Sequence, residues 1–247
     1  MNPQPTPEPS GPKVLSIVIP VYNERDTWKE LLARVESADA AGMKRQILLI
    51  DDGSNDGTRD QLAELEARAC EGQDIEYKVV FHEVNKGKGA ALRTGFAEAD
   101  GDIVIIQDAD LEYDPGDYPR LLVEILEDRA DVVYGSRFYH GRPETIYPAN
   151  YFANRFLTFL SNLATGLKLT DMETCYKAFR REVLRRVELE QDRFGFEPEI
   201  TAKVARLGVR LKEVPISYVG RSHEEGKKIG WRDGLKALWC ILKYAFG

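Results

Sequence analysis

Two carboxylates stand at the end of a hydrophobic run in the middle of the chain. The run DIVIIQ leads directly into Asp108, Ala109 and Asp110. Side chains two apart on a strand share a face, and the turn that follows lets both carboxylates converge on one hard cation. Such a cation keeps open positions for phosphate oxygens. The spacing therefore indicates a site for a divalent cation and a diphosphate, although an isolated pair of this kind is more often two solvated turn residues.

Other hydrophobic runs also end in polar clusters. The first run ends in VIPVYNE, and the run QILLIDDGS carries Asp51 and Asp52. In open α/β sheets the ligand crevice lies outside the carboxyl ends of the strands, where these clusters would meet. The pair at Asp108 and Asp110 is therefore not isolated, which favours a functional interpretation.

The strand-like runs of the first half alternate with helical patterns. Such alternation predicts an α/β fold with a mainly parallel sheet and right-handed crossovers. After DVVYGS the rhythm breaks, and an aromatic-rich helical stretch precedes ETCYKAF. The expected helices are 27–41, 57–70, 89–99, 117–127, 147–163, 198–207 and 231–246, and the expected strands are LSIVIP, QILLID, IEYKVVFH, DIVIIQ, DVVYGS, ETCYKAF and VRLKEVPISYV.

Length and composition set further bounds. With 247 residues and 43% hydrophobic content the chain can bury one substantial core, and we expect a single domain over 13–247. The net charge of −7 argues against non-specific nucleic-acid binding. Three cysteines without a C-x-x-C spacing fit reduced thiols in a cytosolic protein and suggest no zinc site.

The proline-rich segment 1–12 is expected to be a disordered tail, because it has nothing apolar to bury. It lacks the charged start and apolar core of a signal peptide. No other segment approaches the ~18 consecutive apolar residues that a spanning helix needs. We therefore expect a chain that does not cross a membrane unaided.

Four motifs occur in order along the first half: VIPVYNE, IDDGSNDGT, NKGKGAALRTG and QDADLE. With them the chain resembles family-2 glycosyltransferases of the GT-A fold. The remainder, with YGSRF, DMETCYKAFRR, GFEPEI and GKKIGWRDG, resembles more narrowly the polyprenyl-phosphate sugar synthases of the dolichol-phosphate mannose synthase group. The resemblance implies a Rossmann-like sheet flanked by helices, with a nucleotide-sugar-binding half at 13–115, an acceptor half at 116–229 and an amphipathic C-terminal helix at 230–247.

The resemblance also implies how a nucleoside-diphosphate sugar is held. Asp108, Ala109 and Asp110 match the family's metal and diphosphate motif, with Asp110 the more direct ligand of Mg²⁺ or Mn²⁺. On physical grounds, an aromatic ring and a carboxylate at a strand end suit a base and a ribose. For Asn23 and Glu24 the alternative is capping of the next helix. The residues implied for base and ribose are Pro20, Tyr22, Glu24, Ile50 and Asp52.

Basic residues complete the expected phosphate site. Lys86 and Lys88 lie in a glycine-containing turn before a helix, where free N–H groups suit phosphate, although solvated lysines are the plainer alternative. Arg137 matches an arginine that meets a donor or acceptor phosphate in the family. The loop RSHEEGKKI adds three cations that we expect to close over the site, Arg221, Lys227 and Lys228.

The mechanism depends on the acceptor. A cation offsets the charge that builds on the departing nucleoside diphosphate. A lipid phosphate is already anionic and needs no strong base, whereas a hydroxyl acceptor needs a carboxylate. Asp171 and Glu197 are the candidates for that base, with a plain cap or turn role as the alternative. Glu112 and Glu197 stand where relatives carry Gln, which leaves their contributions open.

The resemblance implies an inverting, metal-dependent hexosyltransferase. It would move a sugar from a donor of the GDP-mannose or UDP-glucose type to a polyprenyl phosphate, in the cytoplasm or peripherally on the cytoplasmic face of the membrane. A family-2 transferase acting on a saccharide or protein hydroxyl is the alternative among enzymes. A non-catalytic sugar-nucleotide-binding subunit is a third possibility, against which Asp108 and Asp110 speak.

Two helices carry apolar stripes. The stripe on the C-terminal helix suits a peripheral membrane contact or a membrane partner protein, and the stripe on the aromatic-rich helix suits the flank of a lipid entry groove. A core-facing role is the slightly favoured alternative for both. One stripe lies on the C-terminal helix and the other on the aromatic-rich helix. They consist of Leu235, Leu238, Trp239, Leu242 and Phe246, and of Phe152, Phe156, Phe159 and Leu163.

Overall fold

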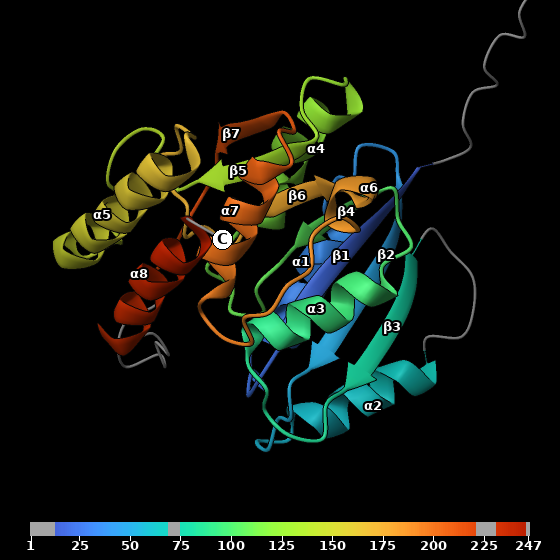
Figure 1. The fold of residues 1–247 in the computed structure, drawn as a ribbon. Helices are drawn as coiled ribbons and strands as arrows, with labels where there is room; N and C mark the ends of the chain where they lie inside the picture. The colour runs from blue at the N-terminus through green and yellow to red at the C-terminus, as the bar shows by residue number, and fades with distance from the viewer. Residues whose placement is uncertain (1–12, 69–74, 221–230, 246–247) are drawn as a thin grey trace, which may run out of the picture.

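The computed structural model describes residues 13–68, 75–220 and 231–245 (Figure 1). Within these residues the strands form one seven-stranded sheet in the order β3-β2-β1-β4-β6-β5-β7. All neighbouring strands pair in parallel except β6, which is antiparallel to β4 and β5. The strands are β1 Val14–Val21, β2 Lys44–Asp51, β3 Ile75–Phe81, β4 Ile103–Ile106, β5 Val132–Ser136, β6 Lys177–Arg180 and β7 Leu211–Pro215.

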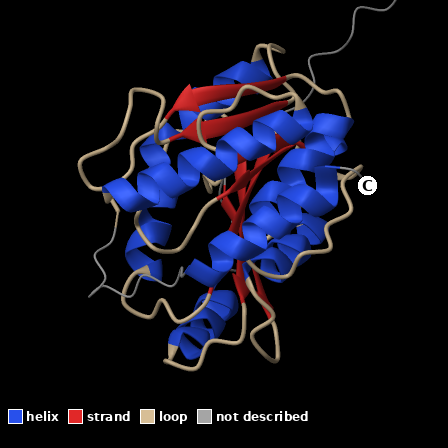
Figure 2. Cartoon of the chain, turned by 60° about the vertical axis from the view of Figure 1, so that its left-hand side comes forward, coloured by secondary structure: helices blue, strands red, loops and turns tan. Residues whose placement is uncertain are grey.

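Helices cover both faces of this sheet (Figure 2). In Figure 1, α3 lies in front of the strands and α1 behind them. The α7 helix shares the face of α3, because the Phe96 and Phe196 rings lie 6.1 Å apart. The helices are α1 Trp28–Ser37, α2 Thr58–Arg68, α3 Lys88–Glu98, η1 Pro115–Asp117, α4 Tyr118–Leu126, α5 Pro148–Thr165, α6 Arg181–Leu184, α7 Phe196–Arg206 and α8 Trp231–Ala245.

The central strands are buried on both faces, as their continuous apolar sequences predict for a parallel sheet covered by helices. Residues 15–19 of β1 and 46–51 of β2 are all buried. The α3 helix approaches β1 closely at Gly95, where a Cβ atom would stand 2.2 Å from Cγ1 of Val18. The predicted α/β class with a mainly parallel sheet is confirmed.

Several predicted boundaries were wrong. The helix expected to extend to residue 41 ends at Ser37, and the strand expected to extend to residue 219 ends at Pro215. Two further differences lie close to the candidate site. The strand expected at ETCYKAF begins only at Lys177, because the preceding segment 171–176 is held in turns by side-chain contacts, including the Cys175 N–H bond to the Tyr113 hydroxyl. The helix expected at Pro198 begins at Phe196. Proline is tolerated in a first turn, since its missing N–H would have no helical partner there.

Several expectations lie outside the described residues. These concern the tail at 1–12, the loop cations Arg221, Lys227 and Lys228, and Phe246. Within the described part of the chain, no helix has both the length and the apolar character needed to cross a membrane.

Candidate active site

The carboxyl ends of the parallel strands bring the predicted site residues to one edge of the sheet. Asp52 follows β2, Asp108 follows β4 and Arg137 follows β5. The antiparallel β6 adds its amino end, Lys177, at the same edge. The antiparallel strand thus delivers the DMETCYK segment to the place where parallel strands end.

Lys88, the first residue of α3, joins two carboxylates. Its Nζ lies 2.8 Å from Oδ1 of Asp108 and 3.4 Å from Oε1 of Glu197. Burial opposes the charged ammonium, but the carboxylates, Asp108 foremost, outweigh it and raise the pKa of Lys88 well above its usual value. Lys88 is therefore a fixed cation beside Asp108 and not a solvated helix-start lysine.

The turn after Asp108 has a strained backbone. Leu111 has a φ of 62°, a left-handed conformation that is rare for a residue with a branched side chain. Oδ1 of Asp110 accepts the Glu112 N–H at 3.1 Å, and Oε2 of Glu112 accepts the Tyr218 hydroxyl at 2.8 Å. These bonds link the turn at Asp110 and Glu112 to Tyr218, which lies in the segment after β7.

The donor set suits a hard divalent cation shared with a ligand. The part of the chain that the structure describes contains no group of three or more His, Cys, Asp or Glu side chains that could hold a metal ion by itself. Asp108 and Asp110 can supply one or two carboxylate oxygens, and diphosphate oxygens and water would complete the coordination, as is usual for Mg²⁺. The residues present therefore fit Mg²⁺ or Mn²⁺ bound together with a diphosphate.

Arg137 and Asp171 form a buried bidentate pair. Nε and Nη2 of Arg137 lie 2.6 and 2.8 Å from the two carboxylate oxygens, and the Arg137 N–H donates to the same carboxylate. Burial disfavours the charged guanidinium, but Asp171 more than offsets this and raises the pKa of Arg137. The guanidinium also lies over the Tyr218 ring, 5.2 Å from its centroid. It is held rigidly near the strand ends.

Asp171 is fully buried against this guanidinium, and its backbone N–H donates to Glu213. A carboxylate already bound on both oxygens by an arginine is poorly suited to take a proton from a substrate. The geometry therefore favours a positioning role for Asp171 over the general-base role that we considered from the sequence.

The loops that carry the residues predicted to hold the nucleotide are linked by hydrogen bonds. The Asn23 side chain accepts from the Asn55 N–H at 2.9 Å and so links the loops after β1 and β2. Glu24 accepts a 2.6 Å bond from Thr27, the residue that precedes α1. Among the residues predicted to bind base and ribose, Pro20 and Tyr22 are half-buried and Ile50 is fully buried in the core, which leaves only its backbone for ligand contact.

Asp52 organises the loop before α3. Its carboxylate accepts from the N–H groups of Lys86 and Gly87 at 2.9 and 2.7 Å, and from His82 at 2.8 Å. The Ala90 N–H donates to the carbonyl of Asp192. The expectation of a free amide cradle was therefore wrong for Lys86, Gly87 and Ala90, because these groups bind the protein itself. Nucleotide contact by Asp52 stays a prediction.

Three residues of the DMETCYK segment were missed as site components. Lys177 is fully buried; its Nζ donates to the carbonyls of Met172 and Thr174 and lies 4.7 Å from the Tyr134 ring centroid. Burial lowers its pKa. The Cys175 thiol is buried and interacts electrostatically with Asp108, and Glu173 lies close to Glu197. The sequence signal that could have identified this segment as part of the site is the presence of charged residues inside a strand-like apolar run.

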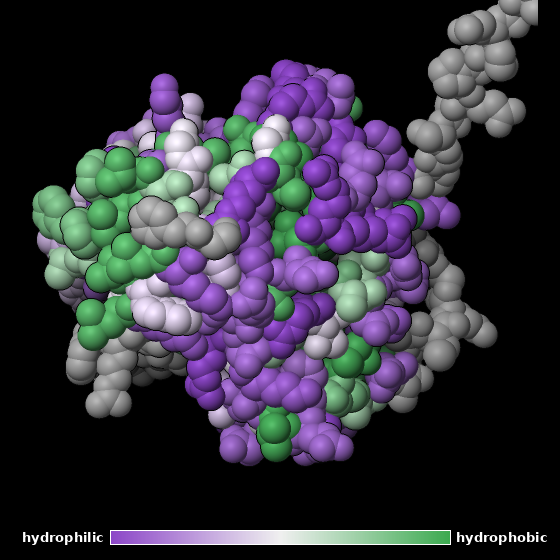
Figure 3. Space-filling view, in the orientation of Figure 1, coloured by the Kyte–Doolittle hydropathy of each residue, from purple (hydrophilic) through white to green (hydrophobic). Residues whose placement is uncertain are grey.

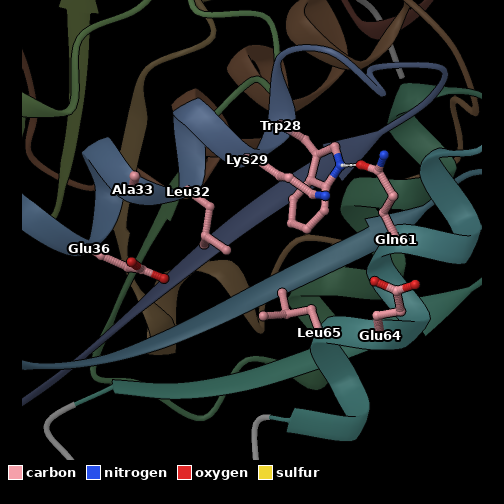
Figure 4. A pocket seen from close by; sticks show the side chains of 8 residues that line it. All are labelled: Trp28, Lys29, Leu32, Ala33, Glu36, Gln61, Glu64 and Leu65. Atoms are coloured by element: carbon pink, nitrogen blue, oxygen red, sulfur yellow. Dashed lines mark hydrogen bonds between the residues drawn. The ribbon is translucent and has the colours of Figure 1, made fainter.

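A shallow hollow of about 220 Å³ lies elsewhere, between α1 and α2 (Figure 4). Its lining includes Trp28, whose indole N–H donates to Gln61 at 2.8 Å. The hollow follows the sides of two helices and not the carboxyl edge of the sheet. We therefore place the active site at the strand ends.

An exposed apolar surface flanks the Arg137–Asp171 pair. The α5 helix buries Thr158 and Ser161 and packs Leu157 and Leu160 against the core, but it exposes its three phenylalanines. The α8 helix packs beside it. Figure 3 shows the resulting apolar patch at the left of the molecule. We call these residues the α5–α8 face; they are exposed by 53 to 76% and comprise Phe152, Phe156, Phe159, Leu163, Leu235, Trp239 and Leu242.

The core-facing alternative for the two stripes was therefore wrong for these seven residues. The buried side of α8 consists instead of Ala237, Cys240, Ile241 and Tyr244. Cys240 and Tyr244 pack with Ala202 of α7 in a small separate cluster.

Known proteins with similar sequences have names that describe transfer of a sugar to a lipid phosphate. An undecaprenyl-phosphate mannosyltransferase of Micrococcus luteus is 33% identical over 95% of this chain and 99% of its own length. An undecaprenyl-phosphate 4-deoxy-4-formamido-L-arabinose transferase of Klebsiella pneumoniae is 34% identical over 87% of this chain. The match spans 62% of that longer protein.

Solved structures share the fold. A glucosyl-3-phosphoglycerate synthase of Mycobacterium tuberculosis, in complex with Mn²⁺, uridine diphosphate and phosphoglyceric acid, superposes with a TM-score of 0.71 at 19% identity, over 95% of this chain and 79% of that one. The likeness confirms the predicted GT-A fold. The family model described as glycosyl transferase family 2 matches residues 16–188, and the chain therefore belongs to glycosyltransferase family 2.

Proposed function

We propose that this protein transfers a hexosyl group from a nucleoside-diphosphate sugar to a polyprenyl phosphate, with inversion and with a divalent cation. The observation that carries the proposal is the convergence of Asp108, Asp110, Lys88 and Arg137 at one sheet edge. The undecaprenyl-phosphate transferases among the relatives support the acceptor class.

Asp108 and Asp110 would hold Mg²⁺ or Mn²⁺ against the donor diphosphate. When bound, the cation offsets the charge that develops on the departing nucleoside diphosphate. Lys88 is partly buried beside Asp108 and adds a positive charge that needs no reorganisation during the reaction. The M. tuberculosis synthase, described in complexes with Mn²⁺ and Mg²⁺ together with uridine diphosphate, supports this choice of cation.

Arg137 would bind the acceptor phosphate. Asp171 orients its guanidinium, and Tyr218 packs against it. A phosphate oxygen attacks the anomeric carbon as the bond to the diphosphate oxygen breaks, so an α-linked donor yields a β-linked product. The nucleophile is already anionic, and no side chain has to remove a proton.

The α5–α8 face would seat on the membrane that contains the lipid acceptor. Its exposed aromatic and aliphatic side chains suit the interface of a bilayer. The α5 helix is also tied directly to the acceptor site, because Arg155 donates to the Thr170 carbonyl and Thr158 accepts from the Met172 N–H. A lipid phosphate could thus reach Arg137 from the adjacent membrane surface.

The test is turnover of radiolabelled GDP-mannose or UDP-glucose by the purified protein with Mn²⁺ and undecaprenyl phosphate. Asp110→Ala should reduce the rate roughly a thousandfold, because the cation loses its direct ligand. The matched control is Asp60→Ala, which changes an exposed carboxylate on α2. Unchanged turnover by Asp110→Ala would contradict the metal assignment.

A hydroxyl acceptor is the second candidate. The buried carboxylate of Glu197, linked to Asp108 through Lys88, favours it, because a hydroxyl nucleophile needs a base nearby. Turnover with saccharides or peptides but not with undecaprenyl phosphate would favour this candidate.

A further inference from the structure

His82 is a buried histidine whose two ring nitrogens are both bonded. It follows β3 directly and is 6% exposed. Its Nδ1 lies 2.8 Å from Oδ1 of Asp52, and its Nε2 lies 2.9 Å from Oγ1 of Thr94 on α3. The His82 backbone is fixed as well, because its N–H donates to the Asp51 carbonyl and its carbonyl accepts from Arg59. The ring is therefore a rigid link between the end of β2 and α3.

The hydrogen bonds around this ring assign its protons. Oδ1 of Asp52 also accepts the Lys86 N–H at 2.9 Å, and Oδ2 accepts the Gly87 N–H at 2.7 Å. A carboxylate that accepts these N–H groups is an acceptor toward the ring as well, so Nδ1 of His82 carries a proton. In a neutral ring, Nε2 then accepts the Thr94 hydroxyl. This series of bonds from Thr94 through His82 fixes the orientation of the Asp52 carboxylate.

Most of the hydrogen-bonding capacity of Asp52 is used inside the protein. Its side chain is 4% exposed, and the two N–H groups that it accepts belong to the residues directly before Lys88. Gly87 has a φ of 107°, a conformation that favours glycine, and a Cβ atom there would collide with the Asp192 carbonyl. The backbone that leads into Lys88 is therefore held in one conformation.

Lys88 is the cation that this loop brings to the site. Its Nζ lies 2.8 Å from Oδ1 of Asp108 and 3.4 Å from Oε1 of Glu197. A lysine side chain is flexible, so the ammonium stays at one place only if the backbone beneath it is fixed. Electrostatic stabilisation of a leaving group depends on charges that are already in place, so a small shift of Lys88 would weaken diphosphate binding.

We propose that His82 and Thr94 are positioning residues of the diphosphate site. They act through Asp52, which holds the loop that carries Lys88, and neither of them touches the ligand. This rests on the proposed function, in which the donor diphosphate lies beside Lys88. The role differs from the base or ribose contact that the sequence predicts for Asp52, because it extends to ligands that have neither base nor ribose.

The experiment measures binding of pyrophosphate with Mg²⁺ by calorimetric titration, because this ligand is a diphosphate without base or ribose. Thr94→Val keeps the shape of the side chain and removes its hydroxyl, and His82→Gln removes the ring. Each should weaken binding of pyrophosphate, and of whichever of GDP and UDP the protein prefers, by the same factor of roughly ten. Thr94→Ser restores the hydroxyl and should bind within about twofold of the wild type. His140→Gln, which changes an exposed histidine, is the matched control.

Lys88→Met supplies a readout that a merely structural role would not move. In the Lys88→Met background, Thr94→Val should cause no further loss of pyrophosphate affinity, because the group that it positions is already absent. Additive losses would overturn the proposal, and so would unchanged pyrophosphate binding in Thr94→Val and His82→Gln. A loss confined to GDP or UDP would also overturn it, because Asp52 would then act on the base or ribose. Wild-type protein that binds neither pyrophosphate nor either nucleotide would overturn the proposed function itself, which distinguishes the two proposals.

Discussion

Two amphipathic helices of this chain face in opposite senses. In the N-terminal half, α1 buries its apolar residues Trp28, Leu31, Leu32 and Val35. In the C-terminal half, α5 buries Thr158 and Ser161 and packs Leu157 and Leu160 partly buried against the core. The same helix exposes Phe152, Phe156, Phe159 and Leu163. The apolar side of α1 is covered by the rest of the chain, whereas α5 exposes an apolar surface that is available to a binding partner. This difference agrees with the proposal that the exposed side of α5 contacts the membrane that contains the lipid acceptor.

One ion pair from each half illustrates the difference between an exposed and a buried pair. On α1, Arg34 and Glu30 form an exposed pair one helical turn apart. In the C-terminal half, Arg137 and Asp171 form a buried pair between residues 34 positions apart in sequence. Exposed pairs contribute little to stability, whereas a buried pair is costly to break.

The largest effect is expected from breaking the buried pair. Arg137→Ala leaves the Asp171 carboxylate buried without its partner and should lower the free energy of unfolding by about 3–5 kcal/mol. Urea denaturation measures the loss. The double variant Arg137→Ala with Asp171→Ala should recover part of it, because no uncompensated charge remains. A double variant less stable than the sum of the single losses would argue against this account.

The α5–α8 face gives the next largest effect, on membrane binding. Phe156→Ser with Phe159→Ser should weaken association with lipid vesicles by about 2 kcal/mol or more, roughly thirtyfold. Both side chains are already exposed, so the melting temperature should hardly change. The matched control is Val84→Ser, an equally exposed apolar residue in the other half. Vesicle binding that resists the double substitution would mean that this face serves a protein partner.

A third effect concerns pH. The Glu173 carboxyl releases its proton near pH 4.5 in the unfolded chain but only near pH 8 in the folded protein. Between these values the folded state binds more protons, so the free energy of unfolding falls as pH rises, by at most about 1.4 kcal/mol per pH unit. Comparing urea melts of Glu173→Gln and wild type across this range checks it. The variant should lack this part of the slope, and parallel curves would show that Glu173 titrates normally.

The smallest effect is expected on α1. Arg34→Ala removes an exposed pair and should change the free energy of unfolding by no more than about 0.5 kcal/mol. The same urea measurement applies. A loss of stability as large as that of Arg137→Ala would mean that the exposed pair and the buried pair contribute equally to stability.

Much of the first half could be predicted from local pattern. The strand ending before Asp108 and the helix beginning near Lys88 lie within a residue or two of their predicted positions. The roles of individual groups were harder to predict. The glycine-rich turn suggested free amides, yet Asp52 and Asp192 occupy those of Lys86, Gly87 and Ala90. These partners are distant in sequence, and no local rule identifies them.

By itself, the sequence determined the family and the fold class, and it predicted the edge of the sheet at which we place the active site. The family and the strand ends can be predicted because they depend on short sequence motifs and on the local pattern of apolar and polar residues. Tertiary structure decided that Asp171 binds Arg137, that Lys88 joins Asp108 to Glu197, and that the stripe of α5 faces outward. A helical stripe has the same periodicity whether it packs inward or outward. Which one occurs depends on the packing partners that the rest of the fold brings to it.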